Sequence, residues 1–289
     1  MASLREIKDR IGSVRSTLKI TSAMKLVASS KLRKAQKAIE GLRPYEQALD
    51  GILSVIAAAP SEDETPRVGG KTAVVVISSN NSLCGAFNSN VIRTCCELVA
   101  GLGDDFVVFP VGKKVAEAMR RRLPSDRLSP VKVELLNHSS YDKSSAFAGE
   151  LRARFDSGEF SKVVLVYNRF VSVSSQKPVV EQYLPFVWKN DGVAQDDEKA
   201  RERRERFIFE PDAEQIAADL LPQLLGLKLH AAILDSTAAE HAARTIAMQT
   251  ATDNGERLLS ELTLEYNKGR QQKITSEILD LVGGSEAGG

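Results

Sequence analysis

A nucleotide site is the first chemistry that this sequence suggests. The tripeptide Gly70-Lys71-Thr72 resembles the end of a phosphate-binding loop, but the position where such a loop needs its first glycine is Thr65. The tripeptide also precedes a predicted strand, whereas a phosphate is bound by the free amides at the start of a helix. No GxGxxG pattern follows that strand. The pattern argues against nucleotide binding, and we expect no cofactor.

The sequence also gives little support for a catalytic nucleophile or for a metal site. Cys84 stands at the junction of a predicted strand and a loop, where a nucleophile could stand, but the sequence offers no base for it. A buried structural thiol is the favoured interpretation. His230 and His241 are about 16 Å apart along a predicted helix, too far to share a metal ion. We therefore expect no catalytic residue and no metal ligand.

Residues 70–190 are the part of the chain that would position any such chemistry. Short, nearly continuous β-branched runs alternate there with helical patterns, as buried parallel strands alternate with crossover helices. The runs predict strands at 72–77, 105–111, 131–136 and 162–167, with an edge strand at 179–186. The patterns between them predict helices at 87–100, 114–122 and 144–155. This order predicts a central Rossmann-like α/β domain.

Residues 1–60 carry a heptad pattern typical of a coiled-coil helix. Of sixteen heptad positions, thirteen are apolar, and the pattern continues over nearly eight heptads. We call these sixteen positions the seam. They are Leu4, Ile7, Ile11, Val14, Leu18, Thr21, Lys25, Ala28, Leu32, Ala35, Ile39, Leu42, Glu46, Leu49, Leu53 and Ile56. So long an apolar stripe needs another long helix to cover it.

Residues 212–289 supply the second helix. Apolar and small residues recur there at helical spacing, although Gly255 and Gly269 each weaken a helix by about 1 kcal/mol relative to alanine. Four further glycines make residues 283–289 poor helix formers. The simplest pairing is an antiparallel coiled coil of the two terminal helices, with an intermolecular coiled coil as the alternative. Residues 191–211, with ten charged residues in the eleven from 196 to 206, are predicted to form a charged surface loop.

Composition limits the classes of protein that this chain can be. The net charge of +1 argues against a strongly basic nucleic-acid binder, yet residues 1–43 alone carry +8. An acidic partner for this helix is therefore plausible, and a solvated helix face is the alternative. No apolar stretch approaches the roughly 18 residues that span a bilayer. Three cysteines without a CxxC pair, and no leader or transit pattern, favour a reduced cytosolic compartment.

Three motifs resemble a known family. The first is Lys19-Ile20-Thr21-Ser22-Ala23-Met24-Lys25-Leu26-Val27-Ala28, followed by Arg43-Pro44-Tyr45. The second is Leu83-Cys84-Gly85 with Phe87-Asn88-Ser89-Asn90. The third is Ala243-Arg244-Thr245-Ile246-Ala247-Met248, and then Tyr266-Asn267-Lys268-Gly269-Arg270-Gln271 leading into Ile274-Thr275-Ser276-Glu277-Ile278. In this order along the whole chain, they resemble the gamma subunits of F-type ATP synthases, and the absence of a chloroplast-type insertion favours a bacterial member.

The resemblance implies a mechanical function. Gamma subunits form the shaft inside a ring of alternating alpha and beta subunits, and their α/β domain sits with epsilon on the c-ring of the membrane rotor. Proton flow turns the shaft and thereby drives ATP synthesis, or ATP hydrolysis turns it in reverse. The chain would then be non-catalytic, peripheral to the cytoplasmic face of the bacterial plasma (inner) membrane, not inserted in it, and without nucleic-acid partners.

The resemblance also implies partner-contact residues. Met24 and Lys25 match the place where the shaft meets acidic lever loops of beta. Lys25 falls on the seam, however, where a lone polar residue can serve only to fix helix register. The polar positions that catch loops of beta or alpha are matched by Arg244, Arg270, Gln271 and Thr275. Without the resemblance, Arg244 would be interpreted as a solvated helix charge.

Two alternatives from other classes remain at this point. An α/β nucleotide-binding enzyme with oligomerising helical arms would need a pocket of convergent polar groups. A nucleic-acid clamp using the basic helix would bind with a steep salt dependence, but only two of sixteen aromatic residues lie outside residues 61–211. The terminal helices therefore offer almost no base-stacking platform.

Overall fold

The computed structural model describes residues 3–56, 69–137, 140–186 and 207–286. The chain divides into two compact units, which we describe separately. Unit 1 comprises Met1–Ser29 with Arg244–Gly289, and unit 2 comprises Ser30–Ala243. Two long helices contribute to both units: α1 (Leu4–Ile56) and α7 (Ala213–Glu286). Most of the segment that was predicted to be a charged surface loop, 191–211, lies outside the described residues.

Unit 2 contains a four-stranded sheet in the order β2-β1-β3-β4. β1 (Lys71–Ile77) lies parallel to β2 (Phe106–Val111) on one side and to β3 (Phe160–Phe170) on the other. β4 (Gln176–Leu184) forms an antiparallel edge next to β3. Every residue of β2, and all of β1 after its first residue, is buried, which explains their continuous apolar runs.

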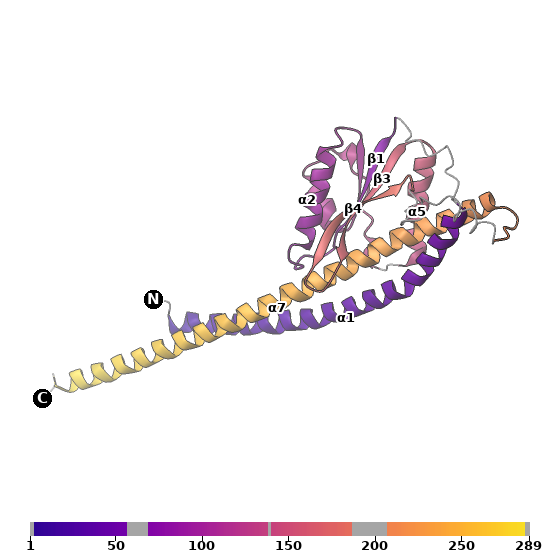
Figure 1. Ribbon diagram of the computed structural model, residues 1–289. Coiled ribbons are helices and arrows are strands. Elements are labelled where there is room, and N and C mark those ends of the chain that lie inside the picture. The colour runs from indigo at the N-terminus through magenta and orange to yellow at the C-terminus, as the bar shows by residue number, and fades with distance from the viewer. Residues whose placement is uncertain (1–2, 57–68, 138–139, 187–206, 287–289) are drawn as a thin grey trace. The chain divides into compact units, whose positions relative to one another are not determined.

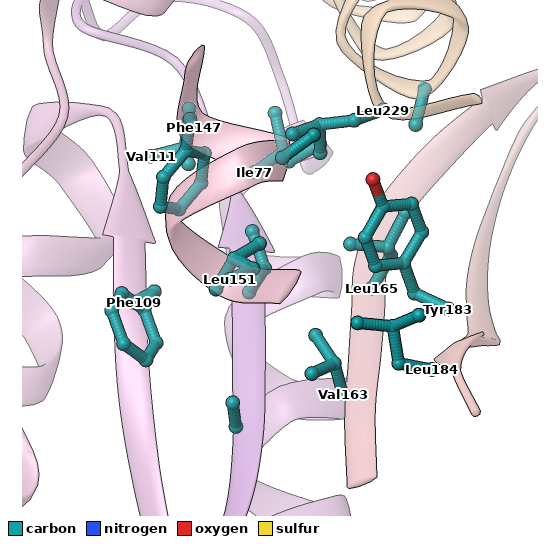
Figure 2. Close-up of a cluster of buried hydrophobic side chains, with 14 of the residues drawn as sticks. Ile77, Phe109, Val111, Phe147, Leu151, Val163, Leu165, Tyr183, Leu184 and Leu229 are labelled. Carbon is teal, nitrogen blue, oxygen red and sulfur yellow. The ribbon is translucent and has the colours of Figure 1, made fainter. Parts of the chain in front are cut away.

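Helices cover both faces of this sheet (Figure 1). α2 (Phe87–Ala100) and α3 (Lys113–Arg120) pack on one face, and α5 (Tyr141–Asp156) and the first part of α7 pack on the other. Figure 2 shows the core on the face covered by α5 and α7, where Leu151 and Leu229 meet side chains from all four strands. The hydroxyl of Tyr183, at the edge of this core, donates to the Leu225 carbonyl at 2.7 Å. The predicted Rossmann-like domain is thus confirmed as a three-layer α/β structure.

The strand predicted at 131–136 is wrong. Backbone hydrogen bonds tie Ser129 and Lys132 to the edge of β2, at 2.9 and 3.0 Å, but they form no continuous ladder. Pro130 has no N–H to donate to such a ladder. A short helix, α4 (Glu134–Asn137), follows and buries Leu135. A 3-10 turn, η2 (Ser125–Arg127), precedes the segment.

The turn between β2 and α3 depends on Gly112. Its backbone has a φ of 108°, in the left-handed region that favours glycine. A Cβ atom at this position would lie 2.6 Å from the backbone oxygen of Ser78, at the end of β1. The close approach lets the amide of Val115 donate to the Ser78 hydroxyl at 3.0 Å. The turn thereby fixes the start of α3 against the carboxyl end of β1.

We expect Gly112→Ala to lower the free energy of unfolding by about 2 kcal/mol, because it combines left-handed strain with a clash against backbone. Urea denaturation followed by circular dichroism measures the change. Gly149→Ala is the matched control, since Gly149 lies exposed within α5 with no atom near its would-be Cβ. That variant should be neutral or more stable by up to about 1 kcal/mol. Equal losses in the two variants would contradict this description of the turn.

The seam predicted for the first helix is confirmed. None of its sixteen side chains is exposed, although exposed residues surround them along α1. In unit 2 the α7 residues Ala238 and Ala242 pack on Leu32 and Ala35. Leu53 is fully buried with Leu224. Because three of the four residues in the first of these contacts are alanine, the two helices can approach each other closely.

The expectation that no stretch is apolar enough to span a membrane needs correction. Among the described residues, α7 contains an 18-residue stretch with a mean hydropathy of 1.3, long and apolar enough for such a span. Of that stretch, 44% is buried within the chain. The Leu- and Ala-rich part of α7 in unit 2 packs on the sheet, with Leu225, Leu229 and Ile233 in its core. A helix that is covered on several sides by its own protein has this composition without a membrane.

The end of α7 also differs from expectation. The helix continues to Glu286 and so passes through Gly283 and Gly284, which were predicted to be poor helix formers. Proline within the long helices does not end them either, since α1 includes Pro44 and α7 includes Pro222. Once a long helix exists, each further residue adds a hydrogen bond, so one unfavourable residue does not stop it.

Candidate partner-contact surface

Unit 1 is a pair of antiparallel helices, formed by the first part of α1 and the second part of α7. Two polar contacts on the seam show their register. The hydroxyls of Thr21 and Thr252 lie 2.9 Å apart, and Lys25 Nζ donates to Gln249 Oε1 at 2.5 Å. Moving forward along α1 therefore corresponds to moving backward along α7. The antiparallel coiled coil is confirmed within the chain itself.

Two glycines that the sequence suggested were weaknesses of α7 lie at its contact with α1. A Cβ on Gly255 would lie 2.7 Å from Leu18 Cδ2, and one on Gly269 would lie 3.0 Å from Leu4 Cδ2. The leucine side chains of the seam therefore pack directly on the α7 backbone. The helix propensity lost at each glycine is offset by this close packing.

Lys25 and Met24 are both half-buried on α1. Lys25 bonds to Gln249, and the amide of Gln249 donates in turn to Asp253 Oδ1 at 2.7 Å. Sequence reasoning missed Gln249 and Asp253, although an antiparallel register would place polar α7 residues opposite a polar seam position. This cross-helix bond supports the interpretation that Lys25 helps to fix register.

Arg244 is buried, with 8% of its surface exposed. This burial contradicts the interpretation of Arg244 as a solvated helix charge. It lies five residues before Gln249 on α7, about 7 Å along the helix axis. Arg244 is thus on the same stretch of α7 as the Lys25 contact.

Arg270, Gln271 and Thr275 form a separate, exposed group near the end of α7. The Thr275 hydroxyl donates to the Gln271 carbonyl one turn earlier at 2.9 Å. Since Gly269 already faces Leu4, the first residue of α1, α7 continues beyond this point without α1 beside it. These three residues lie about 30 to 40 Å along the axis from Gln249. The six candidate residues therefore form two groups, not one site.

Large apolar side chains are exposed on both helices of unit 1. Leu26 on α1 and Leu264 on α7 each have 69% of their surface exposed. Others with at least 44% exposed are Ile20, Val27, Ile246, Ile274, Ile278 and Leu279. A solvated coiled coil carries polar residues on its outer faces, so a helix pair with this many exposed apolar residues suits enclosure by partners.

Comparison with known proteins identifies the family. A family model described as ATP synthase matches residues 3–287. The ATP synthase gamma chain of Bacteroides thetaiotaomicron is 46% identical, with 99% of each chain covered. The ATP synthase gamma chain of Flavobacterium johnsoniae is 39% identical over the same shares. The chain belongs to the ATP synthase gamma chain family. It is accordingly a subunit of the membrane-associated ATP synthase complex.

Solved structures agree with this family. The central stalk and c-ring structure of the Tetrahymena thermophila mitochondrial ATP synthase contains a chain that is 26% identical, with a TM-score of 0.60. The match covers 80% of this chain and 99% of that one. A chain in the Euglena gracilis mitochondrial enzyme, at 19% identity and a TM-score of 0.70, shares the fold over 98% of this chain and 94% of its own.

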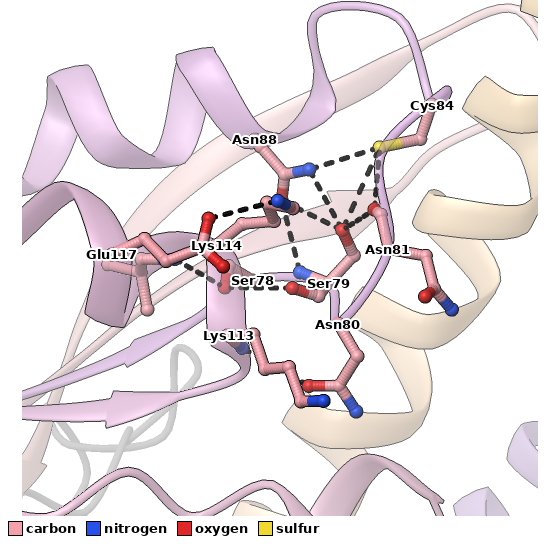
Figure 3. Close-up of polar contacts among 10 residues, drawn as sticks. Ser78, Ser79, Asn80, Asn81, Cys84, Asn88, Lys113, Lys114 and Glu117 are labelled. Atoms are coloured by element: carbon pink, nitrogen blue, oxygen red, sulfur yellow. Dashed lines mark hydrogen bonds and ion pairs between the residues drawn. The ribbon is translucent and has the colours of Figure 1, made fainter.

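The Leu83-Cys84-Gly85 motif of this family member belongs to a polar network, not to a reactive site. Figure 3 shows Asn88 donating to Cys84 Sγ at 3.2 Å and to the Ser79 hydroxyl at 2.8 Å. Cys84 is buried, and the network connects the end of β1 to the start of α2. Burial raises the pKa of a second thiol, Cys95 on α2, to about 12. The interpretation of Cys84 as a structural thiol agrees with this geometry.

The other suspected chemical sites have structural explanations as well. A Cβ on Gly70 would lie 2.6 Å from the backbone nitrogen of Ser161, so this glycine serves the packing of β1 on β3. His230 is buried against the Ser144 hydroxyl, with Nδ1 at 3.0 Å, and burial lowers the pKa of its imidazole. Among the described residues, no three His, Cys, Asp or Glu side chains gather as a metal would require.

Proposed function

We propose that this chain is the rotating shaft of a proton-translocating ATP synthase, turning inside a ring of alpha and beta subunits. Its membership of the gamma chain family over nearly the whole length carries the proposal. In synthesis, proton flow through the membrane rotor turns the shaft. Its asymmetric surface then changes the shape of each catalytic site in the ring.

Several features of α1 and α7 support this function. Two helices packed through a continuous seam resist twisting better than one helix, as a part that transmits torque requires. Exposed apolar residues such as Leu26 and Leu264 would contact the inside of the ring. The excess charge of +8 on residues 1–43 would face acidic loops of beta. The chain would therefore couple its rotation to the catalytic sites of the ring through electrostatic and steric contacts, without catalysing a reaction itself.

The candidate residues would act at two levels of the shaft. Met24, Lys25 and Arg244 would meet partner loops where both helices are present. Arg270, Gln271 and Thr275 would be gripped where α7 continues alone. Unit 2 would contact epsilon and the c-ring, and so hold the complex's rotor at the inner membrane surface of a bacterium.

We expect Lys25→Glu to impair ATP-driven proton pumping several-fold while most ATP hydrolysis remains. The substituted carboxylate can still accept a hydrogen bond from the Gln249 amide, so the helix pair should persist. The cation opposite acidic loops of beta would be lost and replaced by repulsion. Reconstituted vesicles carrying the variant enzyme allow pumping and hydrolysis to be measured together.

Lys19→Glu is the matched control, because Lys19 lies exposed six residues earlier on α1 and off the seam. It changes the charge of the helix equally and should pump nearly as the unchanged enzyme does. Normal pumping per ATP in Lys25→Glu would remove Lys25 from the partner contacts and leave it as a register residue.

A further inference from the structure

A cavity of about 730 Å³ lies within unit 2, between α1, the β3–β4 edge of the sheet and α7. Its volume is that of a small-molecule site. Its lining includes apolar and aromatic side chains, among them Leu42, Val180 and Phe186. Charged side chains line it as well, including Glu46 and Asp235.

A cation of the chain itself, Lys228, lies against the aromatic part of this lining. Lys228 Nζ lies 4.9 Å from the centre of the Phe186 ring and 3.4 Å from Asp50 Oδ2. Arg169 on β3 repeats the arrangement, beside the Tyr167 ring and 3.1 Å from Glu181 Oε2. The walls thus combine an aromatic face with a carboxylate, which is the combination that binds ammonium groups.

Two other carboxylates line the cavity and have no cation paired with them in the described part of the chain: Glu46 and Asp235. Among the described residues, Glu46 and Asp235 form no ion pair, and Asp235 accepts one backbone hydrogen bond from Phe170 at 3.2 Å. Burial raises the pKa of both groups, which reports poor compensation of their charge. The lining of the cavity carries one net negative charge, since four carboxylates stand against three cations: Glu46, Asp50, Glu181 and Asp235 against Arg43, Arg169 and Lys228.

We propose that this cavity binds a small organic cation, namely a primary ammonium joined to an apolar body about the size of one aromatic ring. The ammonium would pair with Glu46. The apolar body would cover Leu42 and Val180, of which Val180 is 47% exposed. Binding at the junction of α1, the sheet and α7 would stabilise unit 2 as a whole.

Isothermal titration calorimetry of the full chain with 2-phenylethylamine tests the proposal. The neutral 2-phenylethanol and the anionic 3-phenylpropionate have similar bodies and serve as ligand controls. We expect saturable binding of one amine per chain, and no saturable binding of the alcohol or the acid. Glu46→Gln should weaken amine binding by about tenfold or more, since a charge-assisted hydrogen bond is lost.

Two further variants sharpen the test. Asp235→Asn is the matched control, because it removes the other carboxylate while keeping an acceptor for Phe170, and it should change affinity by less than about threefold. Lys228→Met removes the resident ammonium beside Glu46 and Asp50, so the guest amine should bind several-fold more tightly. Circular dichroism establishes that each variant is folded.

The proposal is overturned if neither the unchanged chain nor Lys228→Met binds the amine saturably. It is equally overturned if the alcohol binds as well as the amine, or if Glu46→Gln and Asp235→Asn weaken binding to the same extent. Either of the last two results would show that apolar contact or diffuse charge, and not Glu46, governs binding.

Discussion

Leu32→Asp should lower the free energy of unfolding by about 4 kcal/mol. Leu32 is buried on the seam in an apolar cluster with Ala35, Ala238 and Ala242. The substitution therefore loses apolar packing and places a charge among apolar side chains. Urea denaturation of the full chain, followed by circular dichroism, measures the loss of helix and its midpoint.

Ser30→Asp is the matched control for this variant. Ser30 is exposed two residues earlier on the same helix, so the same charge is added outside the seam. Its stability should stay within about 0.5 kcal/mol of the unchanged chain. If both variants unfold at the same urea concentration, the two helices are not held together by the seam.

Two truncations of α7 should differ strongly in their effect. Deleting residues 283–289 should leave assembly and ATP-driven proton pumping largely intact. Deleting residues 274–289 should reduce both several-fold, because it removes Thr275 together with the exposed apolar residues Ile274 and Ile278. All these residues lie where α7 continues beyond the start of α1, so their effect would come from partners and not from the helix pair.

Co-purification of alpha and beta with each truncated chain, and pumping in vesicles, compare the two deletions. The helix extends to Glu286, so the shorter deletion does remove ordered helix. A shorter deletion as damaging as the longer one would show that partners grip the glycine-containing end of α7.

The sequence predicted the helix pair well because the seam is a repeating pattern. Heptad spacing keeps one face of α1 turned toward its partner. Ile7, Ala28 and Leu53 lie on that face and are buried by the contact. The strands β1 to β4 were equally visible, as β-branched runs or at an edge. Local pattern and tertiary burial coincide at these elements, and prediction succeeds where they do.

Prediction failed where the decisive contact is distant in the sequence. Gly255 counted as a weakness until Leu18, more than two hundred residues away, was found against its backbone. Residues 131–136 were predicted as a strand, but Pro130 cannot donate to a ladder, and only isolated backbone hydrogen bonds connect this segment to β2. The sequence of α7 gave no sign that the sheet covers its first part.

The candidate partner-contact residues also include some that the local sequence pattern placed correctly and some that it did not. The heptad pattern placed Lys25 on the seam, and the structure adds its bond to Gln249. Arg244 could not be recognised as buried from its own neighbours in the sequence. Whether Met24, Arg270, Gln271 and Thr275 contact partners depends on surfaces of other subunits, so these positions remain predictions.

Observation of single ATP synthase molecules tests the central proposal most directly. Glu97 on α2 has an exposed side chain, so Glu97→Cys combined with Cys96→Ser gives a site for attaching a bead. The ring of alpha and beta subunits would be fixed to a surface, and ATP supplied. The shaft function predicts that the bead turns continuously in one direction while ATP is hydrolysed. A bead that stays still on a ring that hydrolyses ATP at its normal rate would contradict it.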